Sequence, residues 1–151
     1  MTPSARLSAS IDLLAAMEAA PRKPADAIAN SFFRERRYIG GGDRRAISAL
    51  VWDVMRGWRR LGWWLEQQGQ RPTPRLLAGA QLLFDGMSVQ DVAFLYVGGR
   101  FAAGKPRPAE QAALAALDGQ ELVSPAMPRA VVLAVPEWLP ARLEDTFGMD
   151  V

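Results

Sequence analysis

Apolar residues recur at the spacing of one helical face along most of this chain of 151 residues. The pattern predicts a first helix over residues 3–20, with Thr2 or Ser4 as its N-cap. A second predicted helix has Pro24 in its first turn and ends before three consecutive glycines, residues 40–42. No segment requires a strand to account for its pattern, so we expect an all-α fold with little or no strand.

The strongest amphipathic pattern covers residues 43–68, with Asp43 in the position of a helix N-cap. The apolar side chains of this segment fall within a narrow arc when successive residues are placed 100° apart. The opposite arc holds arginines and two tryptophans, Trp52 and Trp63. Gly57 would allow a kink or a break, because glycine inside a helix costs about 1 kcal/mol relative to alanine.

Three shorter helices are predicted in the second half of the chain. The first of them runs through the apolar residues 76–84 and is stopped by Gly86, the second covers residues 88–97, and the third covers residues 108–117. After these helices the chain is rich in proline, and the apolar run 131–135 fits a strand, a helical turn or an extended segment equally well. The first half is basic and the second half is acidic, which suggests two subdomains of three helices each.

The composition excludes several kinds of chemistry. The chain has no cysteine and no histidine, which removes disulfides, thiolate nucleophiles, the usual zinc sites and Ser–His or Cys–His pairs. The acidic residues are scattered, and the glycines at 40–42 lack the lysine and hydroxyl residues of a phosphate loop. The sequence has no signal peptide and no run of the ~18 apolar residues that a membrane span needs. We therefore expect a cytoplasmic protein without a membrane partner.

Basic side chains are concentrated between residues 34 and 75. This segment contains ten arginines and four acidic residues, although the whole chain has a net charge of only +2. Such a block is typical of a surface that binds a polyanion. Arginine grips phosphate with two hydrogen bonds and stacks on bases, so RNA is the expected partner. Trp52 and Trp63 lie on the same helical arc and could stack on unpaired bases, but we favour burial for both. The candidate RNA-binding residues are Arg34, Arg36, Arg37, Arg44, Arg45, Arg56, Arg59 and Arg60.

Residues 38–69 carry a recognisable pattern, YIGGGDRRAISALVWDVMRGWRRLGWWLEQQG. This segment resembles the NusB-like N-terminal domain of bacterial ribosomal RNA cytosine-C5 methyltransferases of the RsmB (Fmu/Sun) type. The resemblance extends to the first helix, to the segment PTPRLL and to PEWLPARLEDTFG at residues 136–148. Gly62 departs from the family, which usually has aspartate there. The matching residues are Asp43-Arg44, then Leu50-Val51-x-x-Val54-x-Arg56, then Arg60-Leu61-Gly62-x-x-Leu65.

The resemblance implies two packed three-helix bundles that hold RNA. Residues 1–120 would form the NusB-like RNA-binding domain, and residues 121–151 would form an extended segment and linker toward a methyltransferase domain. In that family, catalysis uses two cysteines and S-adenosylmethionine in the downstream domain. This chain has no cysteine. We therefore expect no cofactor and no catalytic residue in it, and interpret it as a fragment whose partners are ribosomal RNA and its own methyltransferase domain.

Two other functions remain open at this stage. The chain could be a stand-alone NusB-like transcription antitermination factor, which would need RNA and a ribosomal protein. Alternatively, it could be a helical docking or dimerisation module that binds no RNA. In that case the arginines would be solvated or paired with acidic residues from 76–151. The sequence leaves the oligomeric state open.

Overall fold

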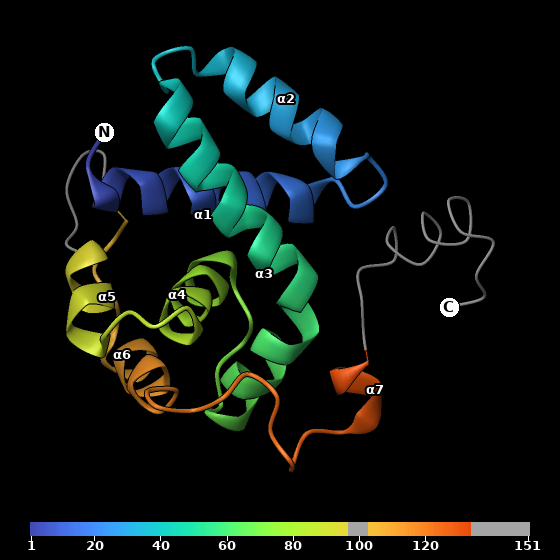
Figure 1. The fold of residues 1–151 in the computed structure, drawn as a ribbon, viewed down its shortest axis with the longest axis vertical. Coiled ribbons are helices and arrows are strands. Elements are labelled where there is room, and N and C mark those ends of the chain that lie inside the picture. The colour runs from blue at the N-terminus through green and yellow to red at the C-terminus, as the bar shows by residue number, and fades with distance from the viewer. Residues whose placement is uncertain (97–102, 134–151) are drawn as a thin grey trace.

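The computed structural model describes residues 1–96 and 103–133, and within these ranges the chain forms seven helices and no strand (Figure 1). The all-α prediction is therefore confirmed for the described residues. The helices are α1 (Pro3–Ala19), α2 (Ala25–Glu35), α3 (Gly41–Gln67), α4 (Pro74–Phe84), α5 (Val89–Leu95), α6 (Pro108–Ala115) and α7 (Arg129–Val132). None of them combines the length and the hydropathy that a membrane crossing requires.

Hydroxyl side chains set the start of three helices. The side-chain oxygen of Thr2 accepts a hydrogen bond from a backbone N–H in the first turn of α1, and Thr73 and Ser88 do the same for α4 and α5. Of the two predicted caps for the first helix, Thr2 is therefore the one used. Ser4 instead donates a hydrogen bond to the carbonyl of Leu95 at 2.6 Å, which fastens α1 to the end of α5.

The start of α3 differs from the prediction. Gly40, not Asp43, occupies the N-cap position, and its carbonyl accepts the first hydrogen bond of the helix from the amide of Arg44 at 2.9 Å. Asp43 lies inside the first turn, where its Oδ1 accepts a hydrogen bond from Nε of Arg6 at 2.6 Å. This bond lowers the pKa of Asp43 below its ordinary value. The prediction of an aspartate cap was wrong because the carboxylate is held by α1, a long-range contact.

Gly57 does not interrupt α3, which is continuous from Gly41 to Gln67. The residue is buried, and a Cβ added to it would lie 3.8 Å from the side chain of Leu61 and 3.9 Å from Oε1 of Gln81. The glycine therefore lies where α3 faces α4, and the helix continues through a residue of low helix propensity.

The core lies where α1, α3 and α4 meet, since each of these helices contacts the other two. As Figure 1 shows, α2 packs beside α1, α5 and α6 lie against α4, and α7 approaches α3. The contacts of α4 with both α1 and α3 join the two halves of the chain, so a division into two three-helix bundles stays a prediction. The largest fully buried aliphatic side chains are Leu7, Leu13, Leu14, Ile47, Leu61, Leu65, Leu76, Leu77 and Leu117.

The C-terminal part is described only as far as residue 133. Residues 116–128 contain turns but no helix, and the predicted apolar run 131–135 begins as the last turn of α7. The remainder of that run and the predicted linker, residues 136–148, lie outside the described residues, as does Val97, the predicted end of the fifth helix. α5 ends at Leu95 and α6 at Ala115, each two residues before its predicted end.

Candidate RNA-binding surface

Four of the predicted RNA-binding arginines gather at the corner where α2 leads into α3; we call them the corner arginines. Arg34 is in the last turn of α2, Arg37 is in the connection, and Arg44 and Arg45 are at the start of α3. The Arg44 guanidinium lies 4.8 Å from the Phe33 ring centroid, which brings the two helix ends together. All four are exposed, and among the described residues none pairs with a carboxylate.

Arg36 is adjacent to the corner but has local structural partners. Its guanidinium carbon lies 3.8 Å from the Phe32 ring centroid, and its Nη1 donates a hydrogen bond to the Phe32 carbonyl at 3.2 Å. The same nitrogen lies 3.8 Å from a carboxylate oxygen of Glu35. Partial burial raises the pKa of Asp12, and the positive charge of Arg36 opposes that rise. Arg36 therefore fastens the end of α2 and differs from its exposed neighbours.

The remaining arginines lie further along α3. From Arg45 to Arg59 the helix axis advances about 21 Å, at about 1.5 Å per residue. Arg56 forms an ion pair with Asp53 one helical turn earlier. Arg59 is exposed and pairs with no carboxylate of the described part of the chain. The structure therefore divides the eight predicted residues into a corner group and a distant group, with Arg36 beside the first.

Arg60 holds the C-terminal end of the described chain. Its Nε and Nη2 both donate hydrogen bonds to the carbonyl of Val132, at 3.0 and 2.6 Å. This fork joins α7 to α3 over 72 residues of sequence. A charged guanidinium on a single carbonyl oxygen is a strong contact. The contribution of Arg60 that the structure displays is therefore structural, and its contact with RNA stays a prediction.

Replacing Arg60 with alanine tests whether its two hydrogen bonds to the carbonyl of Val132 hold α7 against α3. We expect the amides of Val131, Val132 and Leu133 to exchange hydrogen at least about tenfold faster, because losing even one hydrogen bond to a charged group costs about 1.5–3 kcal/mol. Global stability should change by less than about 1 kcal/mol, since α7 contains no buried residue. Hydrogen exchange followed by mass spectrometry measures both, with the exposed neighbour Arg59→Ala as the control. Equal exchange at these amides in both variants would show that Arg60 does not hold α7 against α3.

The two tryptophans of the outer arc are half-buried, so the expected burial is reached only in part. Trp63 packs edge-to-face on Trp64, with ring centroids 5.1 Å apart. Trp64 in turn donates its indole N–H to the carbonyl of Leu122 at 2.8 Å. Trp64 therefore helps to fix the segment after α6, and Trp63 packs against it.

The exposed aromatic residue of this surface is Tyr38, which sequence reasoning did not single out. Its exposed fraction is 77%, the highest of the large hydrophobic side chains in the described residues. It follows Arg37 and lies between α2 and α3. An aromatic residue that follows two consecutive arginines and lies two residues before a glycine run was the available signal, since such a segment connects helices at the surface.

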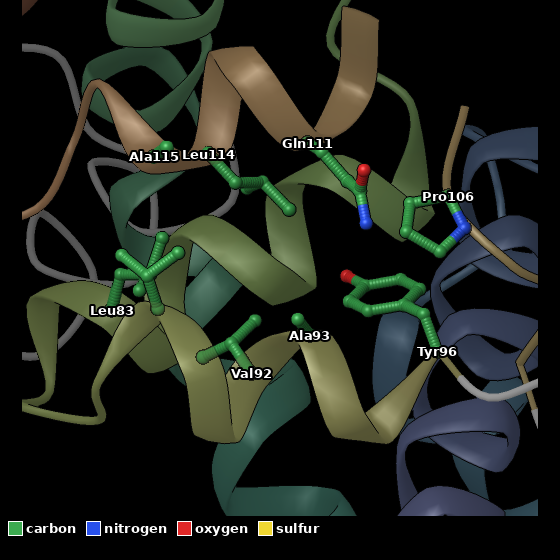
Figure 2. A pocket seen from close by; sticks show the side chains of 9 residues that line it. Leu83, Val92, Ala93, Tyr96, Pro106, Gln111, Leu114 and Ala115 are labelled. Carbon is green, nitrogen blue, oxygen red and sulfur yellow. The ribbon is translucent and has the colours of Figure 1, made fainter. Parts of the chain in front are cut away.

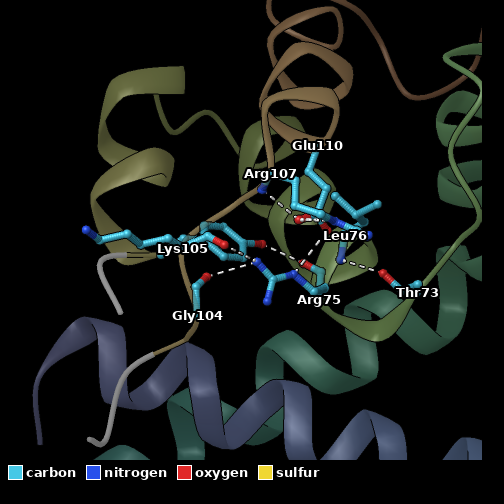
Figure 3. Close-up of polar contacts among 8 residues, drawn as sticks. Thr73, Arg75, Leu76, Gly104, Lys105, Arg107 and Glu110 are labelled. Atoms are coloured by element: carbon cyan, nitrogen blue, oxygen red, sulfur yellow. Dashed lines mark hydrogen bonds and ion pairs between the residues drawn. The ribbon is translucent and has the colours of Figure 1, made fainter. Parts of the chain in front are cut away.

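A second polar cluster, also missed from the sequence, fastens α6 to α4 (Figure 3). Glu110 is buried with 2% exposure; its Oε2 accepts a hydrogen bond from Nε of Arg75 at 3.1 Å, and its Oε1 accepts one from the Arg107 amide at 2.9 Å. Nη2 of Arg75 donates to the carbonyls of Gly104 and Lys105, at 2.9 and 3.2 Å. Each charge has a partner, so this cluster is structural. A glutamate at the third position of the proline-started helix was its sequence signal.

An apolar cavity of about 180 Å³ lies between α5 and α6 (Figure 2). Gln111 and the hydroxyl of Tyr96 are its polar groups, and burial raises the pKa of Tyr96 well above its ordinary range. Binding sites for small-molecule cofactors such as S-adenosylmethionine usually enclose about 300–1,000 Å³ and place several polar groups around the ligand. The cavity does not fit S-adenosylmethionine, and we derive no chemical step through that group. The lining residues are Leu83, Val89, Val92, Ala93, Tyr96, Pro106, Gln111, Leu114 and Ala115.

No known protein family, no curated protein and no solved structure matches this chain significantly.

Proposed function

We propose that this chain is a cytoplasmic, NusB-like RNA-binding domain that positions ribosomal RNA for an S-adenosylmethionine-dependent cytosine-C5 methyltransferase domain of the same protein. One observation carries the proposal. The corner arginines are exposed and, within the described residues, pair with no carboxylate, so their charge is available to a polyanion.

The position of the carboxylates supports RNA over a docking module. If the basic surface were neutralised within the chain, its arginines would pair with acidic residues from 76–151. The described carboxylate partners of the eight predicted arginines are Glu35 and Asp53, both close in sequence to the arginine they contact. Among the described residues of the second half, Glu110 is the acidic residue with arginine partners, and these are Arg75 and Arg107.

The methyltransferase part of the proposal draws on the family resemblance. In it, α1–α3 and α4–α6 correspond to the two three-helix bundles, and Arg60 ties α3 to the segment that leads toward the downstream domain. The coding sequence beyond Val151 tests this part directly. A downstream domain with two cysteines and an S-adenosylmethionine fold supports it, whereas a stop codon favours the antitermination factor.

RNA binding is tested by removing two corner arginines, Arg37→Ala together with Arg45→Ala. We expect affinity for ribosomal RNA fragments to fall about 10- to 30-fold at low salt, because each phosphate contact releases counterions. The slope of log affinity against log salt should decrease by about 0.7 for each single-strand phosphate contact that is lost. Fluorescence anisotropy with labelled RNA measures both quantities.

The matched control removes the same charge elsewhere, with Arg22→Ala and Arg71→Ala. Both residues are exposed; Arg22 lies between α1 and α2, and Arg71 lies between α3 and α4, away from the corner. A general charge effect would weaken binding equally in both double variants. Equal loss in both variants, or no RNA binding by the unaltered chain, would contradict a specific arginine surface.

A further inference from the structure

Tyr38 lies in a hydrogen-bonded turn. The amide of Ile39 donates a hydrogen bond to the carbonyl of Arg36 at 3.0 Å, so Arg37 and Tyr38 are the two central residues of a β-turn between α2 and α3. Central residues of such a turn point their side chains into solvent, in agreement with the 77% exposure of Tyr38.

Both ends of this turn are anchored. On one side, Arg36 covers the Phe32 ring at 3.8 Å and donates a hydrogen bond to the Phe32 carbonyl. On the other side, Ile39 is 8% exposed and belongs to the hydrophobic core. The backbone that carries Tyr38 is therefore fixed while its ring remains in water. A ligand that stacks on a fixed ring loses less conformational freedom on binding than one that must order a loop.

The surroundings of the ring are positively charged. The corner arginines come from the helix before the turn, from the turn itself and from the helix after it. Two nearby carboxylates already have partners: Glu35 faces Arg36, and Asp43 is bound by Arg6. An exposed aromatic face among guanidinium groups that pair with no described carboxylate has the chemistry that holds an unpaired base between flanking phosphates.

We propose that Tyr38 is a stacking platform for an unpaired base, so that this surface selects single-stranded or looped RNA over duplex RNA. In an A-form duplex the bases are stacked inside the helix and present no free face to a protruding ring. The inference rests on the proposed RNA-binding function and specifies which form of RNA the arginine surface takes. It also moves the stacking role from the half-buried tryptophans of α3 to the connection between α2 and α3.

The test compares Tyr38→Ala with Phe94→Ala in the full chain. Phe94 is a suitable control because it is 72% exposed and lies on α5, away from the corner arginines. The probe is a labelled single-stranded RNA of about ten nucleotides. We expect Tyr38→Ala to weaken its binding about tenfold, Tyr38→Phe to stay within about twofold, and Phe94→Ala to have no effect. The salt slope should not change in Tyr38→Ala, because stacking releases no counterions.

The outcomes separate the inference from the function on which it rests. If Tyr38→Ala binds the single strand like the unaltered chain while Arg37→Ala with Arg45→Ala weakens it, the stacking platform is refuted and the RNA-binding surface stands. If Tyr38→Ala weakens binding of a matched RNA duplex as much as binding of the single strand, the selectivity for unpaired RNA is refuted. If the unaltered chain binds neither RNA, the proposed function itself fails.

Discussion

Replacing Gly79 with alanine should destabilise the protein by about 2–3 kcal/mol, because the added methyl group has no space. An ideal Cβ on Gly79 would lie 2.3 Å from Oη of Tyr96 and 3.3 Å from its Cζ. Tyr96 is 2% exposed, and its hydroxyl donates a hydrogen bond to the carbonyl of Arg75 at 2.5 Å. The ring cannot move aside without losing that hydrogen bond. Urea denaturation followed by far-UV circular dichroism gives the free energy of unfolding.

Gly57→Ala is the matched control, because Gly57 is also a buried glycine inside a helix. Its added Cβ would make only ordinary contacts, at 3.8 Å from Leu61 and 3.9 Å from Gln81. We expect this variant to be as stable as the unaltered chain or more stable by up to about 1 kcal/mol, since alanine is the better helix former. The difference between the two variants thus reports the space at each site and not helix propensity.

A double-mutant cycle assigns the effect of Gly79→Ala to the tyrosine hydroxyl. In a Tyr96→Phe background the closest atom is removed, so Gly79→Ala should cost about 1 kcal/mol less than it does alone. Additive effects would show that the clash lies elsewhere, for instance with Cδ1 of Leu114 at 3.4 Å. Full stability of Gly79→Ala alone would contradict the close packing of α5 on α4.

Helix positions were predictable because they depend on local patterns. Threonine and serine caps, the apolar arc of α3 and the glycine after α4 each act within a few residues. Gly86, for example, has a φ of +105°, a conformation that glycine adopts at no steric cost. The wrong prediction at Asp43 has a non-local side to it. Its carboxylate binds Arg6, a partner 37 residues away in the sequence.

The candidate site was predictable only as a set of residues. Charge clustering identified eight arginines, but it could not show that Arg60 binds the carbonyl of Val132 or that Arg36 covers Phe32. Those contacts need the tertiary arrangement. The exposure of Tyr38 depends on the burial of its neighbour Ile39, which a helical pattern does not describe because the residues lie in a turn. The structure thus separates arginines that build the fold from arginines that are exposed and pair with no described carboxylate.

Glu110→Ala should lower the free energy of unfolding by about 2–4 kcal/mol, because removing one partner of a buried ion pair leaves the other without compensation. The Glu110 side chain is 3% exposed and that of Arg75 is 28% exposed, so solvent relieves part of the loss on the arginine. The Arg107 amide at the start of α6 also loses its acceptor. Glu110→Gln keeps an oxygen for that amide, so its free energy of unfolding should lie between those of the unaltered chain and Glu110→Ala. Asp118→Ala, an exposed acidic residue beyond α6, should stay within about 0.5 kcal/mol.

The location of the damage makes this prediction specific. The amide of Arg107 donates its hydrogen bond to Glu110, so this amide should exchange hydrogen faster in Glu110→Ala while those of α2 keep their protection. RNA affinity measured under conditions where the variant is folded should not change, because Glu110 and Arg75 contact none of the corner arginines. Loss of RNA binding in the folded variant would place part of the RNA surface on α4 and α6. Unchanged stability would show that the Glu110–Arg75 pair contributes nothing net to the fold.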